Sequence, residues 1–309
     1  MFTTKPIGTN TLTLSQVNKY PTGLPPRPMR KISSAESMTS NISDPRMLPS
    51  GRTTPTSEQN LDNVSSCLFT EENFATATNM SNLDVECVLT SGRSLDNLPS
   101  SSTPYAIIKY GPTGSGKGSA TVQQEIQQLG VPINDYAVFE IDSLVESVKK
   151  YRNRTLNIKS KYSTASNKRG MYKNLINAYM NTRKNLSRKL DKVLDEAVQT
   201  KKNFIFETTG QTFRGKNPIE WLMERIETVG GGAYKIVVLY PLVTPDVLKQ
   251  RVQKRAEAQS LKQNKPFYRA VNPDTLEEAT LMAKFNLSLF LLPEVFQKRI
   301  HKLVVFWNE

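Results

Sequence analysis

The sequence predicts an α/β fold, with a parallel sheet of about five strands, helices on both faces and a long disordered N-terminal tail. Short, almost wholly apolar segments alternate with longer segments whose apolar residues recur every three or four positions, a pattern typical of buried parallel strands and helices. The first 104 residues differ, because they contain 16 Ser, 15 Thr, 9 Asn and 10 Pro and show no apolar period. We therefore expect a tail over residues 1–104 and one domain over residues 105–309.

The strands and helices can be assigned in chain order from this pattern. The predicted strands cover residues 105–110, 136–141, 203–206, 235–240 and 303–307. The first predicted helix follows the first strand and its loop, and the next two run from about 142 to 151 and from about 172 to 200. A fourth helix carries Ile219, Leu222 and Ile226. The last two helices begin at Thr244-Pro245-Asp246 and at Asn272-Pro273-Asp274. In such a sheet, ligands bind at the carboxyl ends of the strands.

The loop after the first predicted strand reads Gly-Pro-Thr-Gly-Ser-Gly-Lys over residues 111–117. A G-x-x-x-x-G-K pattern between a strand and a helix is typical of a loop that cradles phosphates, and this context disfavours an ordinary glycine-rich turn. Backbone amides of the loop and the positive end of the helix would face the phosphates, and Lys117 would reach the β- and γ-phosphates of ATP. The predicted nucleotide-binding residues are Gly111, Pro112, Thr113, Gly114, Ser115, Gly116, Lys117, Gly118 and Ser119.

The residue after Lys117 departs from this pattern. A Ser or Thr there would bind Mg²⁺ through its hydroxyl, but this chain has Gly118, followed by Ser119. One residue turns a helical side chain by about 100°, so Ser119 is an imperfect substitute as the Mg²⁺ ligand. Either the helix start adjusts, or water completes the metal shell, or catalysis is weak.

Two further polar clusters follow predicted strands and should meet the phosphate loop at one edge of the sheet. Asp142 follows the second strand and is the candidate general base, although it could instead cap the next helix. Glu207, at the end of the third strand, could hold the acceptor's hydroxyls, bind Mg²⁺ through water, or be a loop carboxylate. The candidate substrate-binding residues are Glu207, Thr208 and Thr209.

Two arginines are expected to lie over the phosphates. Arg251 and Arg255 stand four residues apart, hence on one helical face, within a predicted lid over about residues 245–272. Guanidinium groups there would neutralise charge on a transferring phosphate. The alternative is a solvated face, since Lys249 and Lys254 lie nearby.

The charge of the chain is concentrated in the predicted domain. The tail carries 8 Lys or Arg and 9 Asp or Glu, whereas the remainder carries 33 and 19, a net charge of +14. Residues 149–173 contain nine Lys or Arg and no acid, which suggests a basic insertion over the mouth of the site. This charge favours polyanionic partners: nucleoside triphosphates, an anionic small-molecule acceptor or nucleic acid. No membrane-spanning segment, signal peptide or zinc-binding spacing is found, so we expect a cytoplasmic or other intracellular protein with no membrane partner.

With these residues placed, residues 104–309 resemble the zeta-toxin-like kinases of the P-loop kinase group. The resemblance rests on the order of five segments: the phosphate loop, Phe-Glu-Ile-Asp142, Phe-Ile-Phe-Glu207-Thr-Thr-Gly210, the Arg251/Arg255 lid and a final Val-Val-Phe-Trp-Asn308. It implies ATP-dependent phosphorylation of a hydroxyl, in the best-known members on UDP-N-acetylglucosamine. Lys117 would bind phosphate, Asp142 would be the base, and Glu207 and Thr209 would hold the substrate. The resemblance further implies that Arg251 and Arg255 stabilise the phosphate and that Asn308 lies near the nucleotide base.

Three functions remain open at this point. The leading one is a kinase acting on a small phosphorylated metabolite, nucleotide or nucleotide sugar. A nucleic-acid end kinase would use the basic insertion, with Tyr151, Tyr162 and Tyr172 stacking on bases. A non-catalytic nucleotide-binding protein would use the tail to bind a protein partner, for instance through Pro25-Pro26-Arg27-Pro28, although this segment also fits a plain linker.

Overall fold

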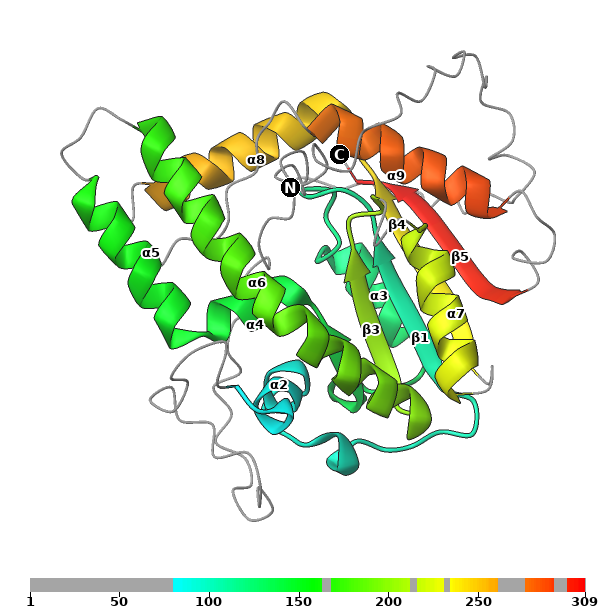
Figure 1. Ribbon diagram of the computed structural model, residues 1–309. Coiled ribbons are helices and arrows are strands. Elements are labelled where there is room, and N and C mark those ends of the chain that lie inside the picture. The colour runs from blue at the N-terminus through cyan, green and yellow to red at the C-terminus, as the bar shows by residue number, and fades with distance from the viewer. Residues whose placement is uncertain are drawn as a thin grey trace, which may run out of the picture.

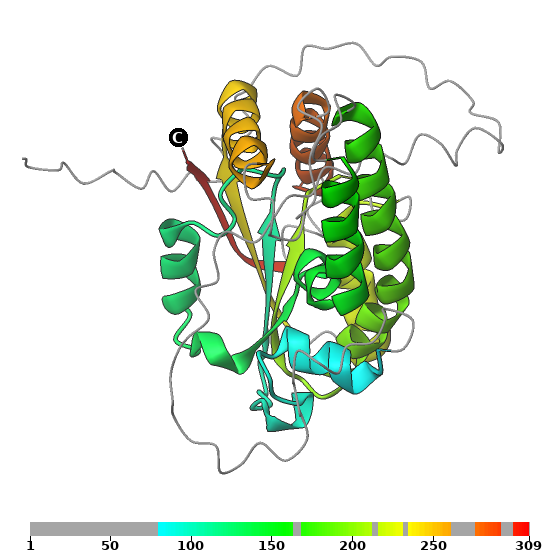
Figure 2. The same cartoon turned by 90° about the vertical axis from the view of Figure 1, so that its left-hand side faces the viewer.

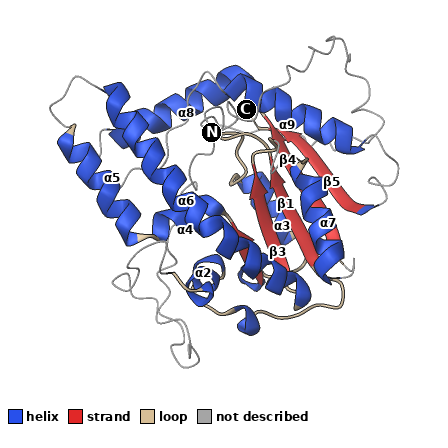
Figure 3. Cartoon of the chain, in the orientation of Figure 1, coloured by secondary structure: helices blue, strands red, loops and turns tan. Residues whose placement is uncertain are grey.

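The computed structural model describes residues 80–162, 168–211, 216–230, 234–260, 276–291 and 299–308. Its centre is a parallel sheet of five strands in the order β2-β3-β1-β4-β5 (Figures 1 and 3). The strands are β1 (Tyr105–Tyr110), β2 (Tyr136–Phe139), β3 (Asn203–Thr208), β4 (Lys235–Leu242) and β5 (Ile300–Trp307). All five predicted strands and the parallel sheet are therefore confirmed.

Alternating side chains of the central strand explain why helices cover both faces of the sheet. Ile108 and Tyr110 of β1 point to one face of the sheet and belong to the larger hydrophobic cluster. Ile107 points to the opposite face and belongs to a smaller hydrophobic cluster. The smaller cluster contains Val122 and Ile126 of α3 (Ala120–Gln127). Figure 2 shows α3 on one side of the sheet and α6 (Lys168–Gln199) on the other.

The helices of the larger face are α2 (Asn82–Leu89), α4 (Ile141–Ser147), α6 and α7 (Pro218–Gly230), each with side chains in the larger cluster. The chain turns at Val148, between α4 and α5 (Lys149–Lys161). The single helix predicted from about 142 to 151 is therefore divided between two helices. The last two helices, α8 (Pro245–Ser260) and α9 (Leu276–Leu291), pack together through Leu248, Val252 and Leu276. Within the described ranges, no helix is both long and apolar enough to cross a lipid bilayer.

The start of the folded domain differs from the expected boundary at residue 104. Helix α2 lies within the predicted tail, yet Val85 and Leu89 are buried in the main core. Its N-terminus is closed by a capping box between Ser81 and Asp84, and Lys202 donates to the carbonyl of Leu98 at 2.6 Å. The apolar side chains of this two-turn helix are enough to pack it against the main core. The sequence around it is too polar for these few apolar residues to form a recognisable helical pattern. Residues 1–79 of the expected tail and residues 261–272 of the expected lid lie outside the described residues.

Candidate nucleotide and acceptor site

The phosphate loop follows β1 at the carboxyl edge of the sheet. Its amides and carbonyls form tight turns, in which Ser115 N donates to Pro112 O at 3.2 Å and Ser119 N donates to Gly116 O at 2.8 Å. Gly116 has φ +92, and a Cβ there would lie 1.8 Å from Nδ2 of Asn308. Only glycine fits this position, because a side chain would have to displace Asn308 as well as adopt a strained backbone.

One side-chain group inside the loop lacks a partner in the described part of the chain. The Ser115 hydroxyl is fully buried, and no described donor or acceptor lies within hydrogen-bonding distance. A buried hydroxyl without a partner is costly, so its presence in a phosphate-type loop fits a site built for an anionic ligand. The loop therefore fits the phosphates of the predicted nucleotide.

Lys117 lies within the loop rather than in solvent. Its ammonium donates to the carbonyls of Gly111 at 2.9 Å and Pro112 at 3.2 Å, and Nζ lies 3.5 Å from Oε1 of Glu207. Burial lowers the pKa of Lys117, and the nearby charges of Glu207, Glu140 and Asp142 oppose this shift. The acids thus help to keep a buried ammonium protonated at the place where phosphates would bind.

The helix after the loop, α3, begins at Ala120. Ser119 is the N-cap of α3, and its hydroxyl accepts a hydrogen bond from Val122 N at 3.4 Å. Ser119 therefore lies just before the first helical residue, and the three alternatives for Gly118 stay predictions. A Mg²⁺ bound at Ser119 would share this hydroxyl with the helix cap. No group of three or more acidic, His or Cys ligands is found among the described residues.

Asp142 lies in the first turn of α4, directly after β2, where its side chain is largely buried. Its Oδ1 accepts a hydrogen bond from the hydroxyl of Tyr179 on α6. Glu140 precedes it as the N-cap residue, and Glu146 follows it one helical turn later. Burial, with a smaller contribution from neighbouring acids, raises the pKa of Glu140 to about 7 and that of Glu146 to about 9. Three acids therefore share this small region.

Helix α8 reaches over the phosphate loop. Arg251 Nη1 donates to the carbonyl of Gly114 at 3.2 Å, and a Cβ on Gly114 would contact Leu248 and Val252 at 3.4 Å. Arg255 lies farther along the same face, where burial lowers its pKa and the nearby carboxylate of Glu207 opposes the shift. Arg251 thus contacts the phosphate loop, and Arg255 lies near enough to Glu207 to interact with its charge; the lid over about residues 245–272 stays a prediction.

The residues after Glu207 link the strand ends to one another. Thr208 O accepts from Gly111 N at 3.2 Å, and Thr208 Oγ1 accepts from Gly210 N at 3.3 Å. Thr208 and Thr209 are both buried. Asn308, at the end of β5, donates from Nδ2 to Ser115 O at 2.7 Å and so ties the last strand to the phosphate loop. This contact places the residue after β5 beside the phosphate loop.

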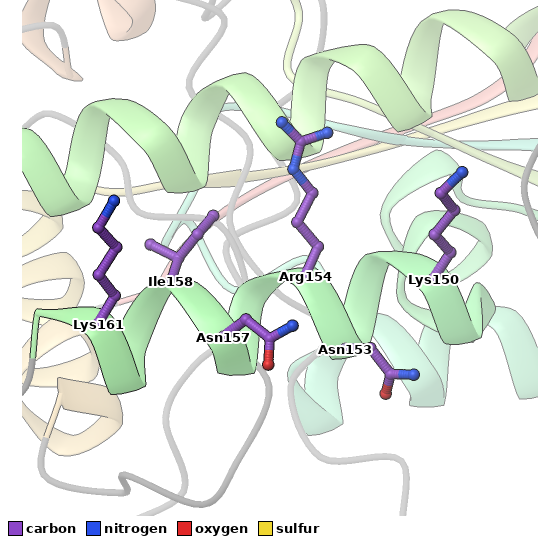
Figure 4. A pocket seen from close by; sticks show the side chains of 6 residues that line it. All are labelled: Lys150, Asn153, Arg154, Asn157, Ile158 and Lys161. Carbon is purple, nitrogen blue, oxygen red and sulfur yellow. The ribbon is translucent and has the colours of Figure 1, made fainter.

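The predicted basic insertion forms α5 and the first turn of α6. An open pocket of about 400 Å³ lies along the exposed side of α5, and Figure 4 shows Lys150, Arg154 and Lys161 extending from the helix in the same direction. The suggested aromatic stacking is not supported for Tyr151, because its ring is buried against Tyr179. Tyr162 accepts a hydrogen bond from Asn174 at 2.9 Å, and the side chain of Tyr172 lies outside the described ones.

The sequence pattern does not single out three residues near Asp142, namely Glu140, Glu146 and Tyr179. Glu140 and Glu146 could have been noticed, because they flank Asp142 in one short segment. Tyr179 is a buried residue of the long helix α6. Its hydroxyl contact was not visible, since Tyr179 and Asp142 are 37 positions apart.

Comparison with known proteins identifies a family model that matches most of the described domain. Residues 91–290 match a family model described as Zeta toxin, a range that includes the phosphate loop, Asp142, Glu207 and both arginines of α8. No curated protein is significantly similar to the chain. A structure from the PezAT chromosomal toxin-antitoxin system of the human pathogen Streptococcus pneumoniae is 14% identical, covering 69% of this chain and 71% of that chain, with a TM-score of 0.45. A candidate kinase from Chloroflexus aurantiacus is 16% identical, covering 58% and 78% respectively, with a TM-score of 0.32.

Proposed function

Since this chain belongs to the Zeta toxin family, we propose that it is an ATP-dependent phosphotransferase acting on a hydroxyl of an anionic small molecule. The acceptor classes are a phosphorylated metabolite, a nucleotide or a nucleotide sugar. One observation carries the proposal: Lys117 and Arg251 both contact the phosphate loop, at 2.9 Å and 3.2 Å, while Glu207 lies 3.5 Å from the lysine. Cationic groups thus surround the place for phosphates, with carboxylates beside it.

In the proposed reaction, the acceptor oxygen bonds to the γ-phosphorus of ATP. The bond from that phosphorus to the bridging oxygen breaks, ADP leaves, and Asp142 accepts the proton of the acceptor hydroxyl. Lys117, Arg251 and Arg255 would stabilise the negative charge of the transferring group. Mg²⁺ would supply further positive charge on the phosphates, with the Ser119 hydroxyl as its proposed protein ligand.

Glu207, Thr208 and Thr209 are the proposed residues for holding the acceptor. Glu207 lies between Lys117 and Arg255, so its carboxylate could orient acceptor hydroxyls beside the transferring phosphate. The two threonines are buried at the same strand end. The Thr208 carbonyl accepts from Gly111 N of the loop, and a bound acceptor would meet Glu207 first because it is the more exposed residue.

A nucleic-acid end kinase is the second candidate within the enzymes. The exposed cations Lys150, Arg154 and Lys161 along one pocket of α5 favour it. The buried ring of Tyr151 opposes the stacking part of that hypothesis. A non-catalytic nucleotide-binding protein is the third candidate, and Gly118 in place of Ser or Thr is the feature that favours it.

The deciding experiment incubates the full chain with ATP, Mg²⁺ and a mixture of metabolites and detects phosphorylated products by mass spectrometry. We expect a product with the wild-type chain and at least about a 100-fold loss in Lys117→Ala, because the phosphates lose their ammonium. Asp142→Ala should lose product to a similar extent while it still binds ATP in calorimetry.

The variants also separate the alternatives. Equal background signal from wild type and Lys117→Ala, with ATP bound by the wild type, would favour the non-catalytic protein. Product formed only when an oligonucleotide is the acceptor would favour the end kinase. Full activity of Asp142→Ala would remove this residue as the base.

A further inference from the structure

The hydrogen bond between Tyr179 and Asp142 connects helix α6 to helix α4, which carries the proposed base. Tyr179 lies near the middle of α6, the long helix over the larger face of the sheet, and Asp142 lies in the first turn of α4. The tyrosine hydroxyl donates to Oδ1 of the carboxylate. Both residues are buried, at 2% and 7% exposure. Water competes little for such a bond, so the bond constrains the carboxylate strongly.

The tyrosine ring is itself held in place. It packs against the ring of Tyr151 on α5 in a T-shaped arrangement, with 6.4 Å between the centroids. The neighbouring residues Leu175 and Ala178 of α6 are fully buried. A buried ring that packs against another buried ring cannot change rotamer freely, so its hydroxyl presents a fixed direction to Asp142.

The surroundings of Asp142 show why a fixed donor is needed there. Glu140 from the end of β2 and Glu146 from α4 are the neighbouring acids, and Lys117 of the phosphate loop is the nearby cation. The ammonium of Lys117 lies 3.5 Å from Glu207 and donates to two loop carbonyls, so these contacts direct it toward the phosphate loop and Glu207. A neutral donor can orient the carboxylate without taking the place of the phosphate-binding ammonium.

We infer that Tyr179 is a positioning residue for Asp142: it holds Oδ1 so that Oδ2 is presented to the acceptor hydroxyl. This inference rests on the proposed phosphotransferase function. Tyr179 itself exchanges no proton with the acceptor. Its effect is to restrict the rotamers of the carboxylate, which keeps the base in a reactive geometry. The α5–α6 pair thereby contributes to the reaction through packing, in addition to any effect of its positive charge.

The test is a double-mutant cycle in the full chain. It compares wild type, Tyr179→Phe, Asp142→Ala and the double variant, with kcat and the KM for ATP measured for each. We expect Tyr179→Phe to lower kcat by about 10-fold or more, with the KM for ATP changed less than about twofold. In the Asp142→Ala background, the same substitution should have no further effect on the residual rate, because the tyrosine acts through the aspartate.

A matched control removes another buried tyrosine hydroxyl. Tyr234 donates to the carbonyls of Ala197 at 3.1 Å and Lys202 at 2.9 Å, both groups of the backbone. Tyr234→Phe should therefore lose stability without a fall in kcat. An equal fall in kcat for both Tyr→Phe variants would overturn the inference, because it would show a general effect of loosening the fold.

A second measurement tests the contact without any use of activity. Urea unfolding of the same four proteins should show non-additive losses for Tyr179→Phe and Asp142→Ala, whereas additive losses would contradict the hydrogen bond. A wild-type chain that forms no product would count against the proposed function, whatever the unfolding cycle shows. A wild-type chain that forms product while Tyr179→Phe keeps full kcat would count against the positioning role alone.

Discussion

Glu146 illustrates how a single, partly buried acid makes this site sensitive to pH. Burial and the neighbouring Asp142 and Glu140 raise its pKa from the ordinary value of 4.5 to about 9. Between these two values the folded chain keeps a proton that the unfolded chain releases, so folding stability falls as pH rises from about 4.5 to about 9. Because Glu146 is protonated at neutral pH, it adds no negative charge next to Asp142.

We therefore predict that Glu146→Gln reduces the loss of stability at alkaline pH. The amide cannot ionise, so the variant should gain about 2 kcal/mol relative to wild type between pH 5 and pH 9. Urea unfolding at a series of pH values measures this difference. Parallel stability curves for the two proteins would show that Glu146 does not hold its proton in the folded state.

Among single residues, those with chemistry at strand ends could be predicted and those acting from other elements could not. Lys117 and Asp142 follow buried strands and Glu207 lies near the end of β3, and the parallel sheet brings their positions together. Tyr179 looks like any other buried residue of an amphipathic helix. Its hydroxyl gains a role only when α6 packs on α4, and this packing is not encoded in local sequence spacing.

At the scale of elements, Gly210 connects β1, the end of β3 and α9. The hydroxyl of Tyr110 donates to the carbonyl of Ala283 at 2.8 Å and to that of Gly210 at 3.1 Å. Asn286 Nδ2 donates to the same Gly210 carbonyl at 2.8 Å. These bonds fix α9 over the residues that follow Glu207. Through the packing of α9 on α8, they also help to place the arginine-bearing helix.

Gly210→Ala should therefore destabilise the fold strongly. The backbone has φ +79, and a Cβ would lie 2.7 Å from the Tyr110 ring and 2.8 Å from Ala283 Cβ. We expect a loss of about 3 kcal/mol in urea unfolding, since both neighbours are buried and cannot move away.

Gly130→Ala is the matched control for that substitution. Gly130 has a similar φ of +75, but nothing lies within 4 Å of its added Cβ. It should cost only about 1 kcal/mol, the penalty for a left-handed backbone. Equal losses for the two variants would show that the close approach of α9 is not important for stability.

At the scale of the whole molecule, the folded domain includes α2 and its following turn. Val85, Leu89, Leu95 and Leu98 are each at most 1% exposed and belong to the main core. Ser100 also forms an antiparallel bridge with Lys202, just before β3. The segment before β1 therefore closes the larger face of the sheet near its amino edge.

Two truncations test this boundary. A chain starting at residue 80 should unfold at nearly the same temperature as the full chain, if residues 1–79 form the tail that their composition predicts. A chain starting at residue 105 should lose about 6 kcal/mol or more, because four buried apolar side chains are removed. Thermal unfolding by circular dichroism distinguishes them. Equal melting temperatures for the two truncated chains would contradict the core position of α2.

The sequence alone determined the strand pattern, the phosphate loop and the sites of the main charged residues. These features are local: a buried strand is an apolar run, and a glycine-rich turn followed by lysine has few other uses. Tertiary structure alone decided that α2 belongs to the domain, that Tyr179 contacts Asp142, and that Asn308 meets Ser115 across 193 positions. Such contacts depend on how helices pack on a sheet, and packing is set by the shapes of side chains far apart in the chain.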